Sequence, residues 1–130
     1  MRIFLSLITI AVTSLFTLFP TIASADEVAF DKGQFEKLIA EGKPVIVDFY
    51  AEWCPTCKTQ KASVEALAAD PKLKDVTIFI ADFDNEKDLR KALRVSSQST
   101  FVVFKGGKEV ARSTGQTKKE AIAATFAKAL

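Results

Sequence analysis

The sequence of 130 residues contains no histidine, and this absence removes several common kinds of active site. Without an imidazole, neither a Ser-His nor a Cys-His nucleophile pair can form, and histidine cannot hold zinc. Any catalysis must therefore use thiols, carboxylates, lysine, tyrosine or backbone groups. Cysteine is also scarce, because the chain has only two, and both stand in one short segment.

An excess of charge of one sign is also missing. Lysine and arginine number 18 against 16 acidic residues, so the net charge is only +2. Because the charges are interspersed and form no basic stripe, we expect no nucleic-acid partner. Internal repeats and low-complexity tracts are absent too. A chain of this length and of 48% hydrophobic residues is long enough for one domain with a core.

The N-terminal segment reads as a targeting signal. Arg2 precedes an uncharged apolar run of about 17 residues, and Ala23-Ser24-Ala25 has the small-residue pattern of a cleavage site. We expect a signal peptide over residues 1–25, cleavage after Ala25, and a mature domain over residues 26–130. The predicted location is outside the cytoplasm, in a bacterial periplasm. The alternative is an uncleaved membrane anchor, since the run is at the short limit of a bilayer span.

Hydrophobic periodicity in the mature chain predicts strands that alternate with helices. Nearly continuous apolar runs are typical of strands buried on both faces. We expect strands at 45–50, 76–81, 100–104 and 108–113, and helices at 31–41, 55–69, 86–93 and 117–129. The predicted order is αβαβαββα, which indicates an α/β fold with a mixed sheet and helices on both faces.

Capping signals support the helix starts. Asp31 with Gln34, and Thr117 with Glu120, have the spacing of capping boxes, and Asn85 is an expected cap of the short helix. Each signal places an oxygen acceptor where the first backbone N–H groups of a helix lack partners.

The two cysteines form the motif Trp53-Cys54-Pro55-Thr56-Cys57, which lies between an expected strand and an expected helix. Thiols at a C-x-x-C spacing can close into a small disulfide or open to a dithiol. The junction places the sulfur of Cys54 at a helix N-terminus, where partial positive charge stabilises a thiolate. This arrangement predicts a redox site.

The segment Val47-Asp48-Phe49-Tyr50-Ala51-Glu52-Trp53-Cys54-Pro55-Thr56-Cys57-Lys58 resembles the V-D-F-W-A-E-W-C-G-P-C-K signature of the thioredoxin family. Phe104-Lys105-Gly106-Gly107 resembles its F-K-x-G hairpin, and Gly115 the glycine before its last helix. The resemblance covers nearly all of the mature chain. It implies the thioredoxin fold, with a central mixed sheet of four to five strands. It also implies a monomer that needs no cofactor and reduces protein disulfides.

The resemblance also assigns roles to residues of this chain. Cys54, with a partly exposed sulfur, is the expected nucleophile, and the more buried Cys57 is the expected resolving thiol. Asp48 interrupts a buried strand, and the matching family residue assists proton transfer at the buried cysteine; alternatively it lies at a solvated strand end. The expected substrate-binding residues are Trp53, Pro55, Thr56, Gln98, Ser99 and Thr100. Trp53 could instead be a core aromatic residue.

Two departures from the family pattern concern the site. Ser99 stands where thioredoxins have a cis-proline, and a cis bond before a non-proline residue costs about 3–4 kcal/mol. We therefore expect the Gln98–Ser99 bond to be trans, or its strain to be held by its surroundings. Ile80 stands where many thioredoxins have a buried lysine, so Asp48 is expected to lack that cationic neighbour.

The direction of electron flow is predicted from the residues between the cysteines. Neither Pro55 nor Thr56 is a histidine that could stabilise the reduced thiolate, which favours a reductase over an oxidase. Disulfide-containing client proteins are the expected partners, and the family resemblance implies a membrane electron transporter as reductant. The alternatives are a dithiol oxidase that makes disulfides, or a module that binds Cu(I) or zinc through both thiols.

Overall fold

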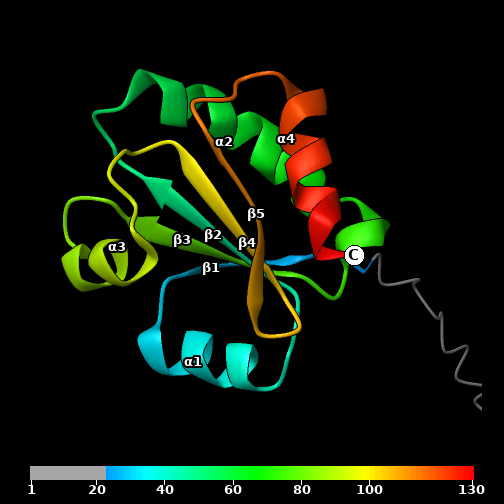
Figure 1. Cartoon of the computed structure of the whole chain (residues 1–130). Coiled ribbons are helices and arrows are strands. Elements are labelled where there is room, and N and C mark those ends of the chain that lie inside the picture. The colour runs from blue at the N-terminus through cyan, green and yellow to red at the C-terminus, as the bar shows by residue number, and fades with distance from the viewer. Residues whose placement is uncertain (1–22) are drawn as a thin grey trace, which may run out of the picture.

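The structure, a computed structural model, describes residues 23–130, so most of the expected signal peptide lies outside the described residues. A five-stranded sheet in the order β1-β3-β2-β4-β5 forms the centre (Figure 1). Its strands are β1 (Asp26–Ala29), β2 (Val45–Tyr50), β3 (Thr77–Asp82), β4 (Thr100–Lys105) and β5 (Lys108–Thr114). The helices are α1 (Lys32–Ala40), α2 (Pro55–Ala68), α3 (Lys87–Leu93) and α4 (Lys119–Phe126), with short 3₁₀ turns at Pro71–Leu73 and Ala127–Ala129.

The central strand β2 carries the chain into the cysteine motif. It pairs parallel with β3 and antiparallel with β4, so the sheet is mixed, as predicted. Asp48 stands opposite Ile80 on one side and Phe101 on the other, and Phe49 stands opposite Thr100. This register brings the segment just before β4 next to the end of β2, where α2 begins.

The first strand was not predicted. β1 pairs parallel with β3 at the edge of the sheet, so the observed order is βαβαβαββα rather than αβαβαββα. Within β1, two of the four residues are acidic and only Val28 is partly buried. A short edge strand of this composition has neither the alternation nor the apolar run by which strands are predicted from sequence.

Two hydrophobic clusters fill the two faces of the sheet. Ile46 of β2 packs with residues of α2 and α4, whereas Val45, Val47 and Phe49 pack on the opposite face with residues of α1 and α3. Figure 1 shows α2 and α4 together on one side of the sheet and α1 on the other. Because side chains alternate along a strand, Asp48 points to the same face as Ile46, toward α2.

The helix caps follow the predictions in part. Asp31 accepts a hydrogen bond from the backbone N–H of Gln34 at 2.7 Å, so the first capping signal is confirmed. The others are wrong: α4 starts after Lys118 and α3 after Glu86, and neither has a side-chain cap. Asn85 donates instead to Asp82, within the turn that precedes α3.

The N-terminal end of the described segment belongs to the domain. Ala25 is buried in the core, and its backbone N–H donates to the carbonyl of Ala68 at 2.8 Å. No helix within residues 23–130 is long and apolar enough to cross a membrane.

Candidate active site

The site is built at the junction of β2 and α2. Cys54 is the N-cap of α2, with extended backbone angles (φ −90°, ψ 111°), and Pro55 occupies the first turn. The backbone N–H of Cys57 donates to Cys54 Sγ at 3.1 Å. Proline fits there because the first helical N–H groups have no partner in any case. The predicted position of the first sulfur at a helix N-terminus is therefore confirmed.

The burial of the two cysteines differs from the prediction. Both are free thiols, and each residue is only 1% exposed, so the partly exposed sulfur expected for Cys54 is not found. Both belong to the hydrophobic cluster that includes Ala51 and Phe83. A thiol packs like a small apolar side chain, which allows this cluster to enclose both sulfurs.

Ser99 brings a hydroxyl group between the sulfurs. Its Oγ lies 3.1 Å from Cys54 Sγ and 3.1 Å from Cys57 Sγ, and the residue is 3% exposed. Among the residues described no peptide bond is cis, so the expectation of a trans Gln98–Ser99 bond is confirmed. Ser99 instead adopts a positive φ of 61°, which an L-residue with a side chain seldom occupies.

Backbone and side-chain hydrogen bonds hold Ser99 in this conformation. Its N–H donates to the carbonyl of Phe49 at the end of β2, and its own carbonyl accepts from the N–H of Gly115, both at 2.9 Å. The amide Nε2 of Gln60 donates to the same carbonyl at 3.3 Å and to the carbonyl of Gln116 at 2.7 Å. Three separate segments of the chain therefore fix the position of the Ser99 hydroxyl.

Gln60 is a site residue that the sequence reasoning missed. It is 1% exposed and lies on the buried face of α2 between Cys57 and Val64. An amide at helical spacing within an otherwise apolar stripe was a detectable signal, since a buried polar group requires a partner. Its Oε1 has no hydrogen-bond partner among the residues described.

The surroundings push the pKa values of the two thiols in opposite directions. Burial raises the pKa of Cys54, but hydrogen bonds from the side chains of Cys57 and Ser99 and from backbone N–H groups outweigh it, and the net pKa is lowered. For Cys57, burial and the hydrogen bond to Cys54 raise the pKa despite a lowering contribution from Ser99. The thiolate therefore belongs on Cys54, the residue predicted to be the nucleophile.

Asp48 is buried, so the alternative of a solvated strand end is wrong. It is 4% exposed, and its Oδ1 has no hydrogen-bond partner in the described part of the chain. Burial, followed by the charge of Glu27, raises its pKa to about 7. Its side chain borders a cavity of about 190 Å³ that Ile80 and Lys61 also line. Ile80 thus lines the cavity at the position where the family pattern has a lysine, while Lys61 brings a cation to the same cavity from α2.

Trp53 and the other expected binding residues fall into two groups. Trp53 is 58% exposed, which excludes a core role, and its Nε1 donates to Asp84 Oδ2 at 2.7 Å. Pro55 is also exposed, and Thr56 and Gln98 are partly buried. Thr100 is buried, and its hydroxyl bonds to the carbonyl of Ser97 and to Thr114 rather than to a sulfur. Asp84, which holds the tryptophan, gave no signal in the sequence.

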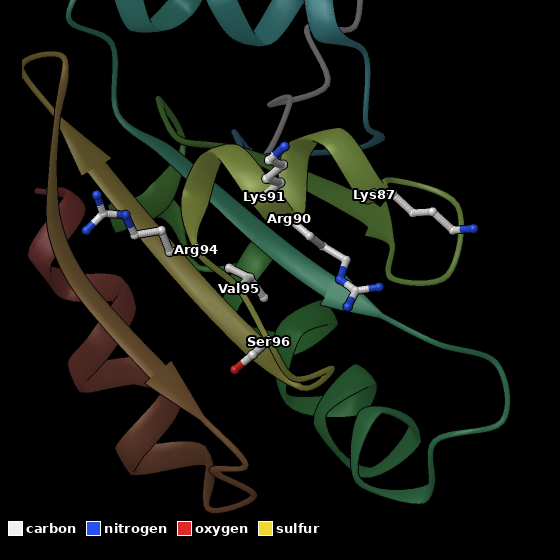
Figure 2. A pocket seen from close by; sticks show the side chains of 6 residues that line it. All are labelled: Lys87, Arg90, Lys91, Arg94, Val95 and Ser96. Atoms are coloured by element: carbon white, nitrogen blue, oxygen red, sulfur yellow. The ribbon is translucent and has the colours of Figure 1, made fainter.

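A separate hollow of about 610 Å³ lies beside α3 (Figure 2). The residues that line it are mostly basic: Lys87, Arg90, Lys91, Arg94, Val95 and Ser96. The guanidinium of Arg90 lies over the Phe83 ring at 3.7 Å and also donates to the Phe83 carbonyl, so this arginine supports the fold. No cysteine borders the hollow, and the redox chemistry therefore belongs to the β2–α2 junction.

Groups that could hold a metal ion were also sought. Residues 23–130 contain no cluster of three or more cysteine, aspartate or glutamate side chains in a metal-binding arrangement. The soft ligands at the site are the two thiols of Cys54 and Cys57.

The whole described domain is similar to known proteins. A sequence model of the family described as Thioredoxin matches residues 26–128. Thioredoxin of Chlamydia trachomatis is 43% identical over 88 residues, 68% of this chain and 83% of that protein. Thioredoxin-2 of Saccharomyces cerevisiae is 36% identical, over 69% of this chain and 88% of its own length.

Solved structures show the same similarity. Trxlp from Edwardsiella tarda superposes with a TM-score of 0.75 at 37% identity, covering 78% of this chain and 98% of that chain. Thioredoxin from Fasciola hepatica superposes with a TM-score of 0.68 at 32% identity, covering 80% of this chain and 99% of that one.

Proposed function

Because this chain belongs to the thioredoxin family and is a protein disulfide oxidoreductase, we propose that it reduces disulfides of client proteins outside the cytoplasm. One observation carries the proposal. The sulfur of Cys54 caps α2, and both the backbone N–H of Cys57 and the Ser99 hydroxyl lie 3.1 Å from it. Hydrogen bonds of this kind favour the anionic form, which is the form that attacks a disulfide.

The proposed reaction has two exchange steps. In the first, the Cys54 thiolate attacks a client disulfide, forms a mixed disulfide and releases one client sulfur as a thiolate. In the second, Cys57 loses its proton and attacks Cys54 Sγ, which releases the other client sulfur. The client gains two electrons, and Cys54 and Cys57 become a disulfide. Because Cys54 is 1% exposed, a client has to displace neighbouring side chains to reach it.

Asp48 is the proposed acceptor of the Cys57 proton. A carboxyl group with a pKa of about 7 is half ionised near neutral pH, so it can both take up and return a proton there. The Asp48 side chain points to the face of the sheet that α2 covers, and Cys57 lies in the first turn of that helix. The cavity of about 190 Å³ beside Asp48 gives the proton a route to solvent.

The proposed client surface surrounds the motif. Trp53 and Pro55 are exposed next to Cys54, and the hydrogen bond to Asp84 fixes the indole, so they offer a flat surface to a client. Gln98 is the most accessible of the three expected binding residues on the opposite loop, because Ser99 and Thr100 are buried. The latter two therefore shape the site more than they contact a client with their side chains.

Export and re-reduction complete the proposal. The leader-like residues 1–25 support secretion to a periplasm, with a membrane electron transporter as reductant. If the leader is not cleaved, it anchors the domain to the membrane. Ala25 packs in the core of the described domain, and cleavage after it would remove this packing and its hydrogen bond to Ala68.

The reduction potential of the Cys54–Cys57 pair tests the direction of this reaction. We expect a value near that of thioredoxin, about −270 mV, because no charged residue separates the cysteines. Equilibration with glutathione or dithiothreitol, followed by mass spectrometry of trapped thiols, measures it. A value near about −120 mV, typical of the strong periplasmic oxidants, would contradict reduction and favour the dithiol oxidase.

A further inference from the structure

The Ser99 hydroxyl lies between the two sulfurs of the redox pair. Its oxygen lies 3.1 Å from Cys54 Sγ and 3.1 Å from Cys57 Sγ, inside a site where both sulfurs are buried. A hydroxyl has one proton to donate and lone pairs to accept with. It can therefore donate to one sulfur while it accepts the S–H of the other, but it cannot donate to both at once.

Only one of the two sulfurs carries a negative charge at each step of the proposed reaction, so one hydroxyl proton is sufficient. When Cys54 is the thiolate, the Ser99 O–H can be directed to it, while the Cys57 S–H has two acceptors within reach, Ser99 Oγ and Cys54 Sγ. In the mixed disulfide, Cys54 has no charge, and the negative charge develops on Cys57. A rotation about the Cβ–Oγ bond is sufficient to turn the same proton to the second sulfur, because both distances are already equal.

We propose that Ser99 is a catalytic residue whose hydroxyl donates its single proton first to the Cys54 thiolate and then, in the mixed disulfide, to the Cys57 thiolate. Ser99 keeps this proton throughout. The Cys57 proton passes to the carboxylate of Asp48, and the two electrons of the dithiol enter the client disulfide. The inference rests on the proposed function, since it assigns a donor to each of its two anions.

No other group around the sulfurs can donate a hydrogen bond to Cys54 and then to Cys57. The charged side chains on the surrounding elements include Asp48 on β2, Lys58 on α2 and Asp84 after β3, and none hydrogen-bonds to either sulfur in the described segment. Backbone N–H groups also donate to the sulfurs, those of Cys57 and Thr56 to Cys54 and that of Ala51 to Cys57, but each of them serves one sulfur only. Among the described residues, the Ser99 hydroxyl is therefore the one group outside the cysteine pair that hydrogen-bonds to both sulfurs.

Backbone hydrogen bonds, rather than packing of its side chain, hold Ser99 in place. Hydrogen bonds from Gly115 and Gln60 fix the Ser99 carbonyl, and Phe49 fixes its N–H. These hydrogen bonds hold the backbone at a positive φ, which places Cβ, and the contacts with both sulfurs place Oγ. The site thus combines a fixed oxygen with a proton that is free to rotate.

Two variants remove the hydroxyl in different ways. Ser99→Ala deletes only the oxygen, and Ser99→Gly also relieves the positive φ, so an effect common to both comes from the hydroxyl. Ser97→Ala is the matched control, because the Ser97 hydroxyl belongs to the same loop but donates to the Gln98 carbonyl. All variants are made in the full-length chain, and circular dichroism checks that each purified protein folds.

The first measurement is the pKa of Cys54, from the pH dependence of its alkylation. Loss of a hydrogen bond to an anion is expected to raise this pKa by about one unit in both Ser99 variants, a tenfold loss of thiolate below the pKa. The reduction potential is expected to become more negative by up to about 30 mV, the value of a tenfold change for two electrons.

The second measurement follows Cys57 directly. Reaction of the reduced protein with an aromatic disulfide releases one coloured thiolate when Cys54 attacks and another when Cys57 attacks. The second release is expected to slow by about threefold, since tenfold less thiolate is offset in part by the greater nucleophilicity of a more basic thiolate. Ser97→Ala is expected to leave the pKa of Cys54 and both rates unchanged.

The results that would overturn the inference are distinct from those that would overturn the function. An unmoved Cys54 pKa in both Ser99 variants, or an equal shift in Ser97→Ala, would refute the Ser99 role alone. A second release as fast as in the wild type would refute the hydrogen bond from the Ser99 hydroxyl to the Cys57 thiolate. A wild-type protein that releases no thiolate at all would refute the proposed function itself.

Discussion

Replacement of Cys57 by serine is expected to stop the reaction halfway, with the client held on Cys54 through a disulfide. Cys54 keeps its position as the cap of α2 and the hydrogen bond from the backbone N–H at position 57, so it still attacks. The second step is lost because a hydroxyl does not displace a thiolate from a disulfide at neutral pH. Turnover should fall by at least about a thousandfold, as for the loss of a covalent catalyst.

Non-reducing electrophoresis and mass spectrometry of the purified Cys57→Ser protein test this expectation. A small protein with one accessible disulfide serves as client, and the mass of the complex is expected to disappear with dithiothreitol. Cys54→Ser is the matched control, and it should give neither a complex nor reduction. A complex that forms through Cys57 in this control would mean that the two cysteines have the opposite roles.

Replacement of Asp48 by asparagine is expected to make the protein more stable and less active at once. In the folded protein Asp48 stays protonated up to about pH 7, whereas an unfolded chain loses this proton near pH 4. The folded state binds the proton more tightly, so the free energy of unfolding falls as pH rises from 4 to 7. The total loss is about 4 kcal/mol, from about three pKa units at about 1.36 kcal/mol each.

The side-chain amide of the Asp48→Asn variant has no proton to lose in this range, so the substitution should abolish the loss. We expect equal stability of the two proteins near pH 4, and a variant more stable by a few kcal/mol at pH 8. Urea unfolding at each pH measures both curves. Asp88→Asn, an exposed change on α3, is the control and should leave the pH dependence as it is. A variant less stable than the wild type at pH 8 would contradict the burial of a neutral carboxyl group.

The same substitution is expected to slow the attack by Cys57. Removal of a proton acceptor costs about a hundredfold or more in rate for a general base, so the release of the second thiolate should fall by about that factor near pH 7. The first release should change little, because Cys54 has its own donors. An unchanged second release would show that the Cys57 proton leaves by another route.

The main features of the fold could be predicted because their causes are local. The apolar run 45–50 could only be a strand with both faces covered, and Pro55 marked the first turn of the following helix. The signature around Cys54 then placed the redox pair between them. Asp48 was noticed for the same reason, since a carboxylate interrupts this apolar run, but the structure was needed to exclude a solvated strand end.

The remaining features depend on contacts between distant segments. Whether Ser99 reaches the sulfurs follows from its positive φ and from bonds to Gly115 and Gln60, and neither is visible in the motif. The burial of Cys54 likewise depends on how the apolar cluster closes over it. The edge strand β1 has too few apolar residues to be predicted, and it forms because β3 offers its backbone groups.

The most direct test of the account is to map which cysteine reacts first with iodoacetamide as the pH is raised. Each cysteine is 1% exposed, so a difference in rate reports ionisation rather than access. Cys54 is expected to be alkylated first, with a midpoint below that of an ordinary thiol, and Cys57 only at higher pH. Equal rates, or faster alkylation of Cys57, would contradict it.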